Sequence, residues 1–361
     1  MESEKFRLTY LYKRLGRHLG LLAVQVLLLT CAACEERLRL PYIEPALHNW
    51  PENYHGVAGL KLHVFNTGSI QVPSRVVYES GSLAQRQALD ILVFGIEHPK
   101  HGLILIGTGL NRAIVQDAEH YLGGFRSAIG AAHMEPEQDI LSQLKTAQLS
   151  PDKVSSVVLP DLRLDHAGEL ESFSHATVVV TSAEHTAAIS SGNFGLYLQD
   201  EFDQVGEWQF VDFTASKPLG TFRTALDVFG DGSVELIDVT GATAGGIAVL
   251  VRLPTQPVIL CGNLAWTESQ YRYAWTPGFA FKREAWWDAV WRLKKFKDLF
   301  PALVVLPDHD WVAVEKAKTA DMIDMIVHTF SAPESSEDDT ERDAALRHNP
   351  PRSRFSRNFS G

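Results

Sequence analysis

The 361-residue sequence contains little cysteine, with only Cys31, Cys34 and Cys261. The first two lie in an N-terminal apolar segment, so the rest of the chain carries a single thiol. One thiol cannot form an internal disulfide, which excludes a disulfide-stapled scaffold even in an exported protein. Cys261 ends the apolar run PVILC, where we expect a buried and unreactive side chain.

The chain also lacks an excess of positive charge. It has 33 Lys and Arg against 44 Asp and Glu, a formal net charge of -11. Because nucleic-acid binding requires clustered cationic side chains, this balance argues against a nucleic-acid partner. A hydrophobic share of 45% is that of an ordinary globular protein, and a chain of this length can bury a sizeable core.

Several common catalytic motifs are absent from the sequence. It has no Gly-x-Ser-x-Gly nucleophile motif and no glycine-rich phosphate loop. It also has no internal repeat of fixed short period. These absences argue against a serine nucleophile on a tight strand-to-helix turn and against phosphate-loop chemistry.

The N-terminus combines basic and apolar residues. Five Lys and Arg residues precede the apolar run 19–34, LGLLAVQVLLLTCAAC. This order is typical of a secretory signal, and the run is shorter than a membrane span needs. Its end, Cys31-Ala32-Ala33-Cys34, resembles a bacterial lipoprotein cleavage site, with Cys34 as the lipidated residue. We therefore expect an exported bacterial protein, lipid-anchored on the periplasmic side of a membrane; a plain signal peptide, an uncleaved anchor and a buried helix are the alternatives.

Composition divides the chain into four segments. They are the signal peptide 1–34, a proline-containing linker 35–57, a domain 58–330 and a tail 331–361. The tail runs from acidic (ESSEDDTERD) to basic and has few apolar residues, so we expect it to be disordered.

Short β-rich runs alternate with helical runs inside the domain. Predicted strands are 60–67, 91–97, 103–107, 154–159, 177–181, 247–253, 257–261 and 302–306. Predicted helices are 137–147 and 283–300, and the second carries one apolar face that indicates core packing. Strands followed by helices indicate sheets covered by helices.

Polar residues gather where these strands end. The segment 159–170, LPDLRLDHAGEL, follows a strand and contains Asp161, Arg163, Asp165 and His166. Further polar motifs at strand ends are DVTGATAGG (238–246), CGN (261–263) and LPDHDW (306–311). Loops at strand ends are where a rigid scaffold holds functional groups, so we expect one site built from these motifs.

The order and spacing of these motifs resemble the metallo-β-lactamase fold superfamily, near the quorum-quenching lactonase-like hydrolases of bacteria. The resemblance covers roughly residues 58–315, including IEHPKHGLILIGTGL, VVLPDLRLDHAGE, PVILCGNLAW and VVLPDHDW. It implies an α/β (α+β) fold, a four-layer αββα sandwich. In that family a His-x-His-x-Asp-His motif, a lone His, a bridging Asp and a final His hold two zinc ions. A bridging hydroxide then attacks an ester, lactone or amide carbonyl.

The first zinc site of the family needs three imidazoles, and this chain has none of them. The resemblance places Asp161, Arg163 and Ala242 at those positions, and Gly107 where the family has a supporting Asp. Arginine stays protonated and has no lone pair for a metal. It also repels Zn²⁺, by roughly 4 kcal/mol at a separation of ~4 Å and an effective dielectric constant near 20. We expect this site to be lost.

The second zinc site is partly kept. Asp165, His166 and His309 match the family, while Asn263 replaces the bridging Asp and Asp161 is a possible substitute carboxylate. Three ligands and a water form a catalytic zinc geometry in principle. One metal there would lower the pKa of its water to about 7 and polarise the carbonyl of a small-molecule ester or lactone. The first hypothesis is therefore one zinc ion at most, with Asp165 taking part in catalysis.

The second hypothesis makes Arg163 a replacement for the metal. It lies two residues from both Asp161 and Asp165, and its guanidinium could pair with both carboxylates. Asp165 and His166 would then be structural remnants, no zinc would bind, and the pocket would hold a ligand or partner without turnover. The sequence leaves both hypotheses open.

A few other side chains are weaker candidates. Tyr271 and Tyr273 follow the Asn263 loop and could donate a phenol proton to a substrate, Tyr271 being the catalytic candidate of the two. We expect His98 and His101, in the turn EHPKHG, to face solvent. His185 opens a helix near the pocket in relatives, without binding metal.

Overall fold

The computed structural model describes residues 43–44, 46–191, 196–319 and 325–331. The expected signal peptide with Cys34, residues 35–42 and 45 of the expected linker and nearly all of the expected tail lie outside the described residues. Within the described part, no helix combines the length and the apolar character that a membrane crossing requires.

The larger sheet has the strand order β14-β1-β2-β3-β5-β6-β7, with β4 paired to β1. Strands β1, β2 and β3 form an antiparallel meander, β14 runs parallel to β1, and β3, β5, β6 and β7 run parallel to one another. The strands are β1 (Lys61–Pro73), β2 (Arg86–His98), β3 (Gly102–Ile106), β4 (Ala131–His133), β5 (Val154–Val158), β6 (Thr177–Thr181), β7 (Glu207–Val211) and β14 (Met325–His328).

The smaller sheet has the order β13-β12-β11-β10-β9-β8. It is antiparallel except for the parallel pair β12 and β13. The strands are β8 (Lys217–Leu219), β9 (Phe222–Asp227), β10 (Val234–Asp238), β11 (Ile247–Arg252), β12 (Pro257–Leu260) and β13 (Val304–Leu306).

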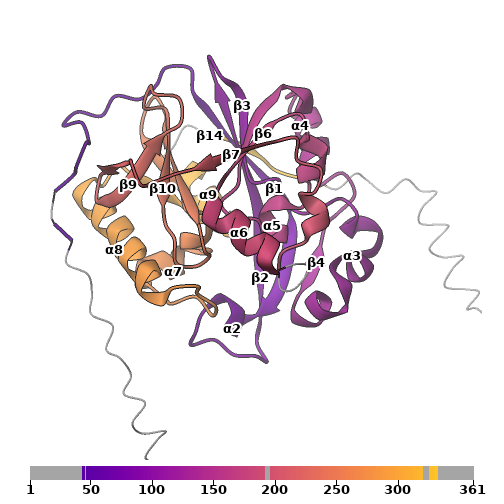
Figure 1. Ribbon diagram of the computed structural model, residues 1–361. Helices are drawn as coiled ribbons and strands as arrows, with labels where there is room; N and C mark the ends of the chain where they lie inside the picture. The colour runs from indigo at the N-terminus through magenta and orange to yellow at the C-terminus, as the bar shows by residue number, and fades with distance from the viewer. Residues whose placement is uncertain (1–42, 45, 192–195, 320–324, 332–361) are drawn as a thin grey trace, which may run out of the picture. The chain divides into compact units, whose positions relative to one another are not determined.

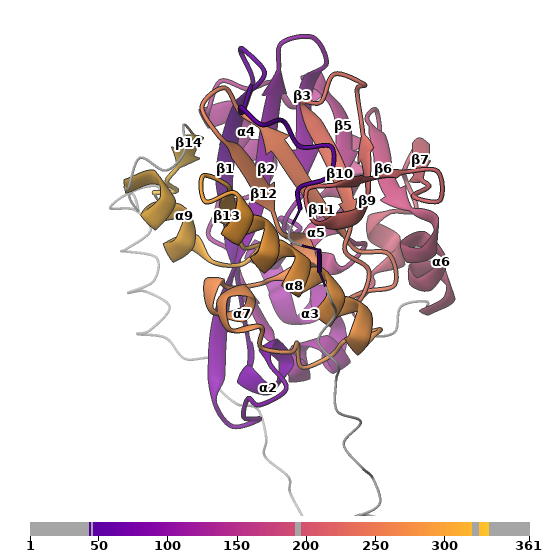
Figure 2. The ribbon, with the colours of Figure 1, turned by 90° about the vertical axis from the view of Figure 1, so that its left-hand side faces the viewer.

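Helices cover the outer faces of both sheets (Figures 1 and 2). On the smaller sheet, Trp286, Val290 and Leu293 of α8 pack against Leu250 and Ile259 in one buried cluster. α4 and α6 contribute to a second cluster on the outer face of the larger sheet. The helices are α2 (Ser74–Val77), α3 (Ile114–Ile129), α4 (Ile140–Thr146), α5 (Leu164–Ala167), α6 (Ser182–Ser191), α7 (Glu268–Tyr273), α8 (Arg283–Leu299) and α9 (Trp311–Thr319).

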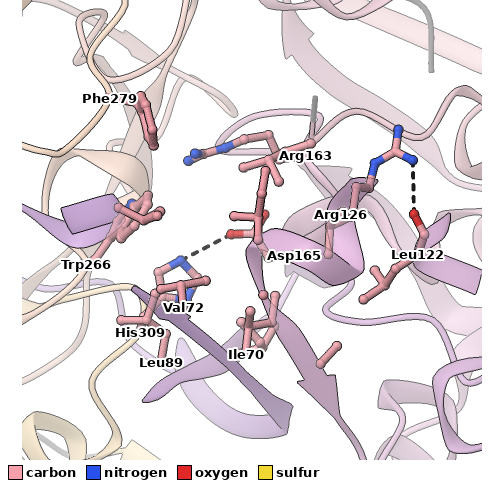
Figure 3. A pocket seen from close by; sticks show the side chains of 17 residues that line it. Ile70, Val72, Leu89, Leu122, Arg126, Arg163, Asp165, Trp266, Phe279 and His309 are labelled. Carbon is pink, nitrogen blue, oxygen red and sulfur yellow. Dashed lines mark hydrogen bonds and ion pairs between the residues drawn. The ribbon is translucent and has the colours of Figure 1, made fainter. Parts of the chain in front are cut away.

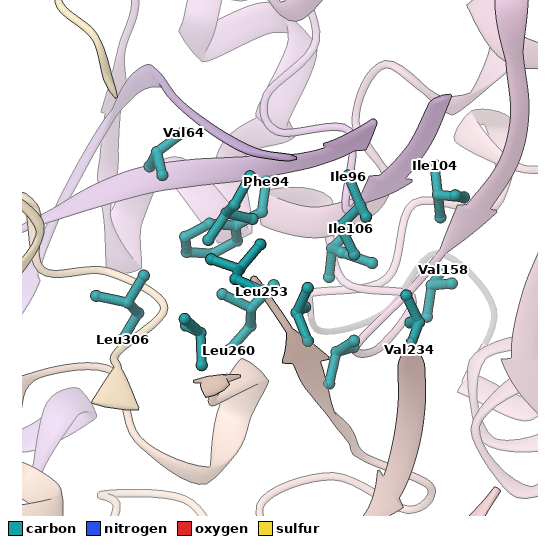
Figure 4. Close-up of a cluster of buried hydrophobic side chains, with 14 of the residues drawn as sticks. Val64, Phe94, Ile96, Ile104, Ile106, Val158, Val234, Leu253, Leu260 and Leu306 are labelled. Atoms are coloured by element: carbon teal, nitrogen blue, oxygen red, sulfur yellow. The ribbon is translucent and has the colours of Figure 1, made fainter. Parts of the chain in front are cut away.

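The main core lies between the two sheets. Phe94 and Ile96 of the larger sheet and Val249 and Leu260 of the smaller one belong to a single buried cluster (Figure 4). The layers are therefore helices, sheet, sheet, helices, which confirms the αββα sandwich expected from the sequence.

The predicted elements match observed ones but differ at their ends. The strand expected at 60–67 extends to Pro73 as β1, past an irregularity between Asn66 and Ser69. The helix expected at 137–147 begins only at Ile140, because the Asp139 side chain accepts a hydrogen bond from the Ser142 amide and caps it. Strands β7 to β10, β14 and helix α3 had no clear signal in the sequence.

Candidate functional site

The site lies where β5, β12 and β13 end. Arg163 immediately precedes α5, whose four residues include Asp165 and His166. Asn263 follows β12 after Gly262, which has φ +49° and would place a Cβ only 2.5 Å from the Ile247 carbonyl oxygen. Glycine at that position lets the chain turn and bring Asn263 inward.

Asp161 lies at the centre of the site and is completely buried. Its Oδ1 accepts hydrogen bonds from the Arg163 amide (3.0 Å) and from Nδ1 of His166 (2.7 Å). Its Oδ2 accepts from Nε of Arg163 (2.6 Å) and from the Asn263 side-chain amide. Burial favours the neutral acid, but the charges of Arg163 and His166 outweigh it and lower the pKa of Asp161. Each oxygen of this carboxylate thus accepts two hydrogen bonds from other groups of the protein.

Arg163 holds Asp161 and Asn263 together. Its Nη2 donates to Oδ1 of Asn263, which also accepts from the indole nitrogen of Trp266 (2.6 Å). The guanidinium carbon lies 5.4 Å from the centroid of the Trp266 ring, a cation–π distance. Burial lowers the pKa of Arg163, but Asp161 and Asp165 outweigh it and raise that pKa. Arg163 therefore occupies the site as a permanent cation.

His166 is held between two carboxylates. Its Nδ1 faces Asp161, and its Nε2 lies 2.5 Å from Oδ2 of Asp308. A ring nitrogen that faces a carboxylate must carry a proton to donate, so two such contacts select the imidazolium. Burial lowers the pKa of His166, but Asp308 and Asp161 outweigh it and raise that pKa well above its ordinary value.

His309 pairs with Asp165, which the sequence suggested as a partner of Arg163. Its Nε2 lies 3.2 Å from Oδ2 of Asp165, and its Nδ1 donates to the Asp90 carbonyl (2.8 Å). Burial lowers the pKa of His309, but Asp308 and then Asp165 outweigh it and raise that pKa. Arg163 makes its direct ion pair with Asp161 instead. The sequence predicted that Arg163 pairs with both Asp161 and Asp165, and the structure shows a direct ion pair with Asp161 alone.

The site is balanced in charge. Three cationic side chains, Arg163, His166 and His309, face three carboxylates. Asp308, one of the three, has no signal in the sequence beyond its place in the motif LPDHDW. It lies 142 residues from its partner, and no local pattern marks it.

A cavity of about 440 Å³ opens beside this cluster (Figure 3). Its wall is mostly aliphatic; Arg163, Asp165 and His309 form its polar end, and Arg126 lines it beside Leu122. The lining residues are Ile70, Val72, Val76, Leu89, Ile91, Leu122, Arg126, Ile129, Gly130, Ala132, Arg163, Leu164, Asp165, Leu196, Trp266, Phe279 and His309. The volume lies within the roughly 300–1,000 Å³ of small-molecule sites.

Comparison with known proteins identifies the family. A sequence model of the metallo-beta-lactamase superfamily matches residues 91–309. This chain belongs to the metallo-beta-lactamase superfamily. The chain is 27% identical over 265 residues to the N-acyl homoserine lactonase AttM of Rhizobium radiobacter. The match covers 72% of this chain and 97% of AttM.

Solved structures show the same superfamily fold. An N-acyl homoserine lactone hydrolase, with its product N-hexanoyl-L-homoserine at the catalytic metal centre, matches with a TM-score of 0.61 and 19% identity. A mutant of AiiA from B. thuringiensis, with N-decanoyl-L-homoserine at its active site, matches with the same score and identity. Each match covers 72% of this chain and 95% of the other one.

The superfamily implies a zinc centre. Whether zinc fits here depends on whether the side chains have lone pairs free to bind it. Ligand atoms of Asp165, His166 and His309 lie within 4.8 Å of one another, close enough for one ion. However, both nitrogens of His166 donate to carboxylates, and Oδ1 of Asn263 accepts from two donors. A metal would have to remove a proton from His166 and displace Asp308. In this arrangement the residues do not fit a zinc ion.

The other superfamily positions border the site without completing it. A Cβ on Gly107 would lie 3.6 Å from His166, so this glycine sits beside the ring that the family's Asp would support. Glu184 accepts hydrogen bonds from the amides of Leu162 and Gly245 and thereby joins the Arg163 loop to the Ala242 loop. Ala242 itself packs against the cluster beneath α8.

The tyrosine and the lone histidines have other surroundings. Tyr271 belongs to the buried cluster beneath α8 and does not line the cavity, so nothing in its position favours a catalytic role. Tyr273 is exposed. His185 packs against the rings of Trp208 and Phe210, away from the cavity lining.

His98 is buried, and the expectation that it faces solvent was wrong. It lies with His101 and Asp231 in a group close enough to hold a metal. Its Nδ1 accepts hydrogen bonds from the amides of Lys100 and His101, so the proton of the neutral ring is on Nε2. Nε2 faces Ser233 and Asp231 and is the nitrogen that would have to bind the ion. The hydrogen bonds therefore favour a structural role.

Proposed function

We propose that this chain is a lactonase-like superfamily member that binds a small amphipathic molecule and does not hydrolyse it with a metal. One observation carries the proposal: His166 uses both ring nitrogens on Asp161 and Asp308. A zinc ligand must offer a lone pair, and an imidazolium has none. Arg163 supplies positive charge at the position where the family has an imidazole ligand of the first zinc.

The cavity supports the binding part of the proposal. It combines a largely aliphatic wall with a few polar groups at one end, which is the composition of small-molecule sites. Two structural relatives hold N-hexanoyl- and N-decanoyl-L-homoserine at their active sites. Acyl homoserine lactones and their ring-opened products are therefore the first ligands to test.

A second candidate is hydrolysis assisted by one metal. The proximity of Asp165, His166 and His309 favours it. Metal binding there requires His166 to lose a proton and to break its contact with Asp308. Both steps cost free energy, whereas a histidine that is already neutral and unpaired binds a metal without that cost. The two candidates differ in metal content and in turnover.

The test uses protein purified without chelators from cells grown with zinc. Elemental analysis after dialysis should find well under one equivalent of zinc, iron or manganese. Calorimetry with N-decanoyl homoserine lactone should show binding, while a pH-stat assay should show no release of acid. One stably bound metal together with opening of the lactone would establish the second candidate instead.

We also propose that the protein is exported and anchored to a membrane through Cys34. The support is the sequence pattern alone, a basic segment followed by an apolar run that ends in Cys31-Ala32-Ala33-Cys34.

A further inference from the structure

The cavity has two chemically different ends. One end is built mainly from aliphatic side chains of β1, β2 and α3, including Ile70, Leu89 and Leu122, with Arg126 beside Leu122 (Figure 3). The other end presents Arg163 and Asp165, with Trp266 and Phe279 beside them. A molecule that fills the cavity must therefore combine an apolar chain with a polar head.

The charged groups that line the cavity are mainly cationic. Two arginines, Arg126 and Arg163, line it together with a single carboxylate, Asp165. That carboxylate is engaged by His309 at 3.2 Å. The other two carboxylates of the charge-balanced cluster, Asp161 and Asp308, lie behind the lining. A head group in the cavity thus meets more positive than negative charge.

Arg163 has a donor that the protein does not use. Its Nε donates to Asp161 and its Nη2 to Asn263. Among the described residues, no hydrogen-bond acceptor contacts Nη1, and this atom is not enclosed by protein. The Trp266 ring and the two hydrogen bonds fix the guanidinium plane, so Nη1 is held ready for an acceptor.

We propose, building on the proposed function, that the natural ligand is an amphiphilic carboxylate whose head accepts hydrogen bonds from Nη1 of Arg163. Its apolar chain lies among the aliphatic residues at the opposite end of the cavity. A neutral ester or lactone offers only a carbonyl to the same donor. Arg163 is a cation, so its hydrogen bond is charge-assisted with either head, but only the carboxylate adds the attraction between opposite charges and is therefore preferred.

The experiment compares heads and chains on the unaltered full-length protein by titration calorimetry. Octanoate and octanamide share one chain and differ in head charge, and octanoate should bind at least tenfold tighter. Decanoate should bind tighter than octanoate, by about fourfold for each added methylene. Octylammonium should not bind measurably. Octanamide binding as tightly as octanoate would overturn the inference.

Two variants separate the ends of the cavity. Arg163→Met should remove the preference for octanoate over octanamide and keep the dependence on chain length. Ile129→Trp, which fills the aliphatic end without touching the charged cluster, should weaken both ligands at least tenfold. The comparison of heads on the parent protein stands even if Arg163→Met fails to fold. Retained head preference in a folded Arg163→Met variant would also overturn the inference.

The outcomes distinguish this inference from the proposed function. Stable zinc and lactone opening would contradict the proposed function, whatever the fatty-acid result. Equal binding of octanoate and octanamide by a metal-free, non-hydrolytic protein would contradict only the assignment of the ligand class.

Discussion

Nε2 of His166 lies 2.5 Å from Oδ2 of Asp308, while Nδ1 on the other side of the ring lies 2.7 Å from Asp161. The histidine that the superfamily uses as a metal ligand is here a cation between two carboxylates. Two loops, one after β5 and one after β13, are joined through this ring. The contact links the two loops through a residue whose surrounding sequence resembles a catalytic motif.

Arg163→Ala should destabilise the protein strongly. The side chain is 12% exposed and pairs with the completely buried Asp161. Removing one partner of such a pair typically costs about 3–5 kcal/mol. The control is Arg223→Ala, because the Arg223 side chain is 68% exposed and its partner Asp288 keeps a second ion pair with Arg292, so its loss should cost at most about 1 kcal/mol. Urea denaturation measures both, and an Arg163→Ala variant as stable as the control would contradict the proposed replacement of the metal.

Asp308→Ala should increase zinc uptake. Loss of this carboxylate frees Nε2 of His166 and lowers the pKa of the ring, so a lone pair becomes available near Asp165 and His309. We expect zinc content to rise toward one equivalent. Asp310→Ala in the same loop removes the cap of α9 and should leave the zinc content unchanged. Elemental analysis measures the zinc content of both variants. Equal zinc content would refute the proposal that Asp308 keeps His166 from binding zinc.

Restoring the superfamily's residues should restore a metal centre. The combined change Asp161→His, Arg163→His and Ala242→His returns the three imidazoles of the first site. Asn263→Asp then adds the bridging carboxylate. Zinc content should exceed that of the parent, with detectable lactone hydrolysis in the fourfold variant. A matched variant without Ala242→His should bind less zinc. No gain in any rebuilt variant would mean that the Ala242 loop lies in the wrong place for a ligand.

Acidification should weaken the attachment of strand β14. Nε2 of His328 on β14 lies 3.0 Å from Nδ1 of His63 on β1, and burial, then His63 and Lys318, lower the pKa of His328 to about 4. The unfolded chain takes up this proton near pH 6.5, so the stability present above that pH is lost between pH 6.5 and 4. After discounting for partial exposure, we expect this loss to be about 1–2 kcal/mol.

The variant His328→Phe tests that dependence. It keeps the aromatic contact with Phe65, whose ring centroid lies 4.4 Å away, and removes the titrating group. Denaturant unfolding at pH 7 and at pH 4.5 should show a smaller stability loss for the variant than for the parent. Equal losses would assign the acid sensitivity to other groups, such as Glu97 beside His63.

The membrane anchor predicts how the protein fractionates. Full-length protein expressed in a bacterium should be recovered with membranes and carry lipid on Cys34. Cys34→Ser should remain unprocessed or appear in the soluble fraction, while Cys261→Ser, at the buried thiol, should not alter fractionation. A mature protein that starts at another residue and remains soluble in the periplasm would contradict the anchor.

The sequence by itself indicated the αββα sandwich, through its resemblance to the superfamily, and set one chemical limit on the site. The apolar face of α8 and the buried strands follow from side-chain periodicity, which local sequence carries directly. The identities of Asp161, Arg163 and Ala242 already deny the first zinc site its imidazoles, because a side chain cannot donate a lone pair that it lacks.

Only the tertiary structure decided how the remaining residues pair. Arg163, expected to pair with both nearby carboxylates, pairs with Asp161, while Asp165 turns to His309. Asp308 meets His166 across 142 residues, and Tyr271 turns into the core instead of toward the cavity. Hydrogen bonds depend on the direction in which each loop leaves its strand. Periodicity in the sequence predicts which face of an element is buried. It does not predict which loops come into contact, because that depends on how the two sheets pack against each other.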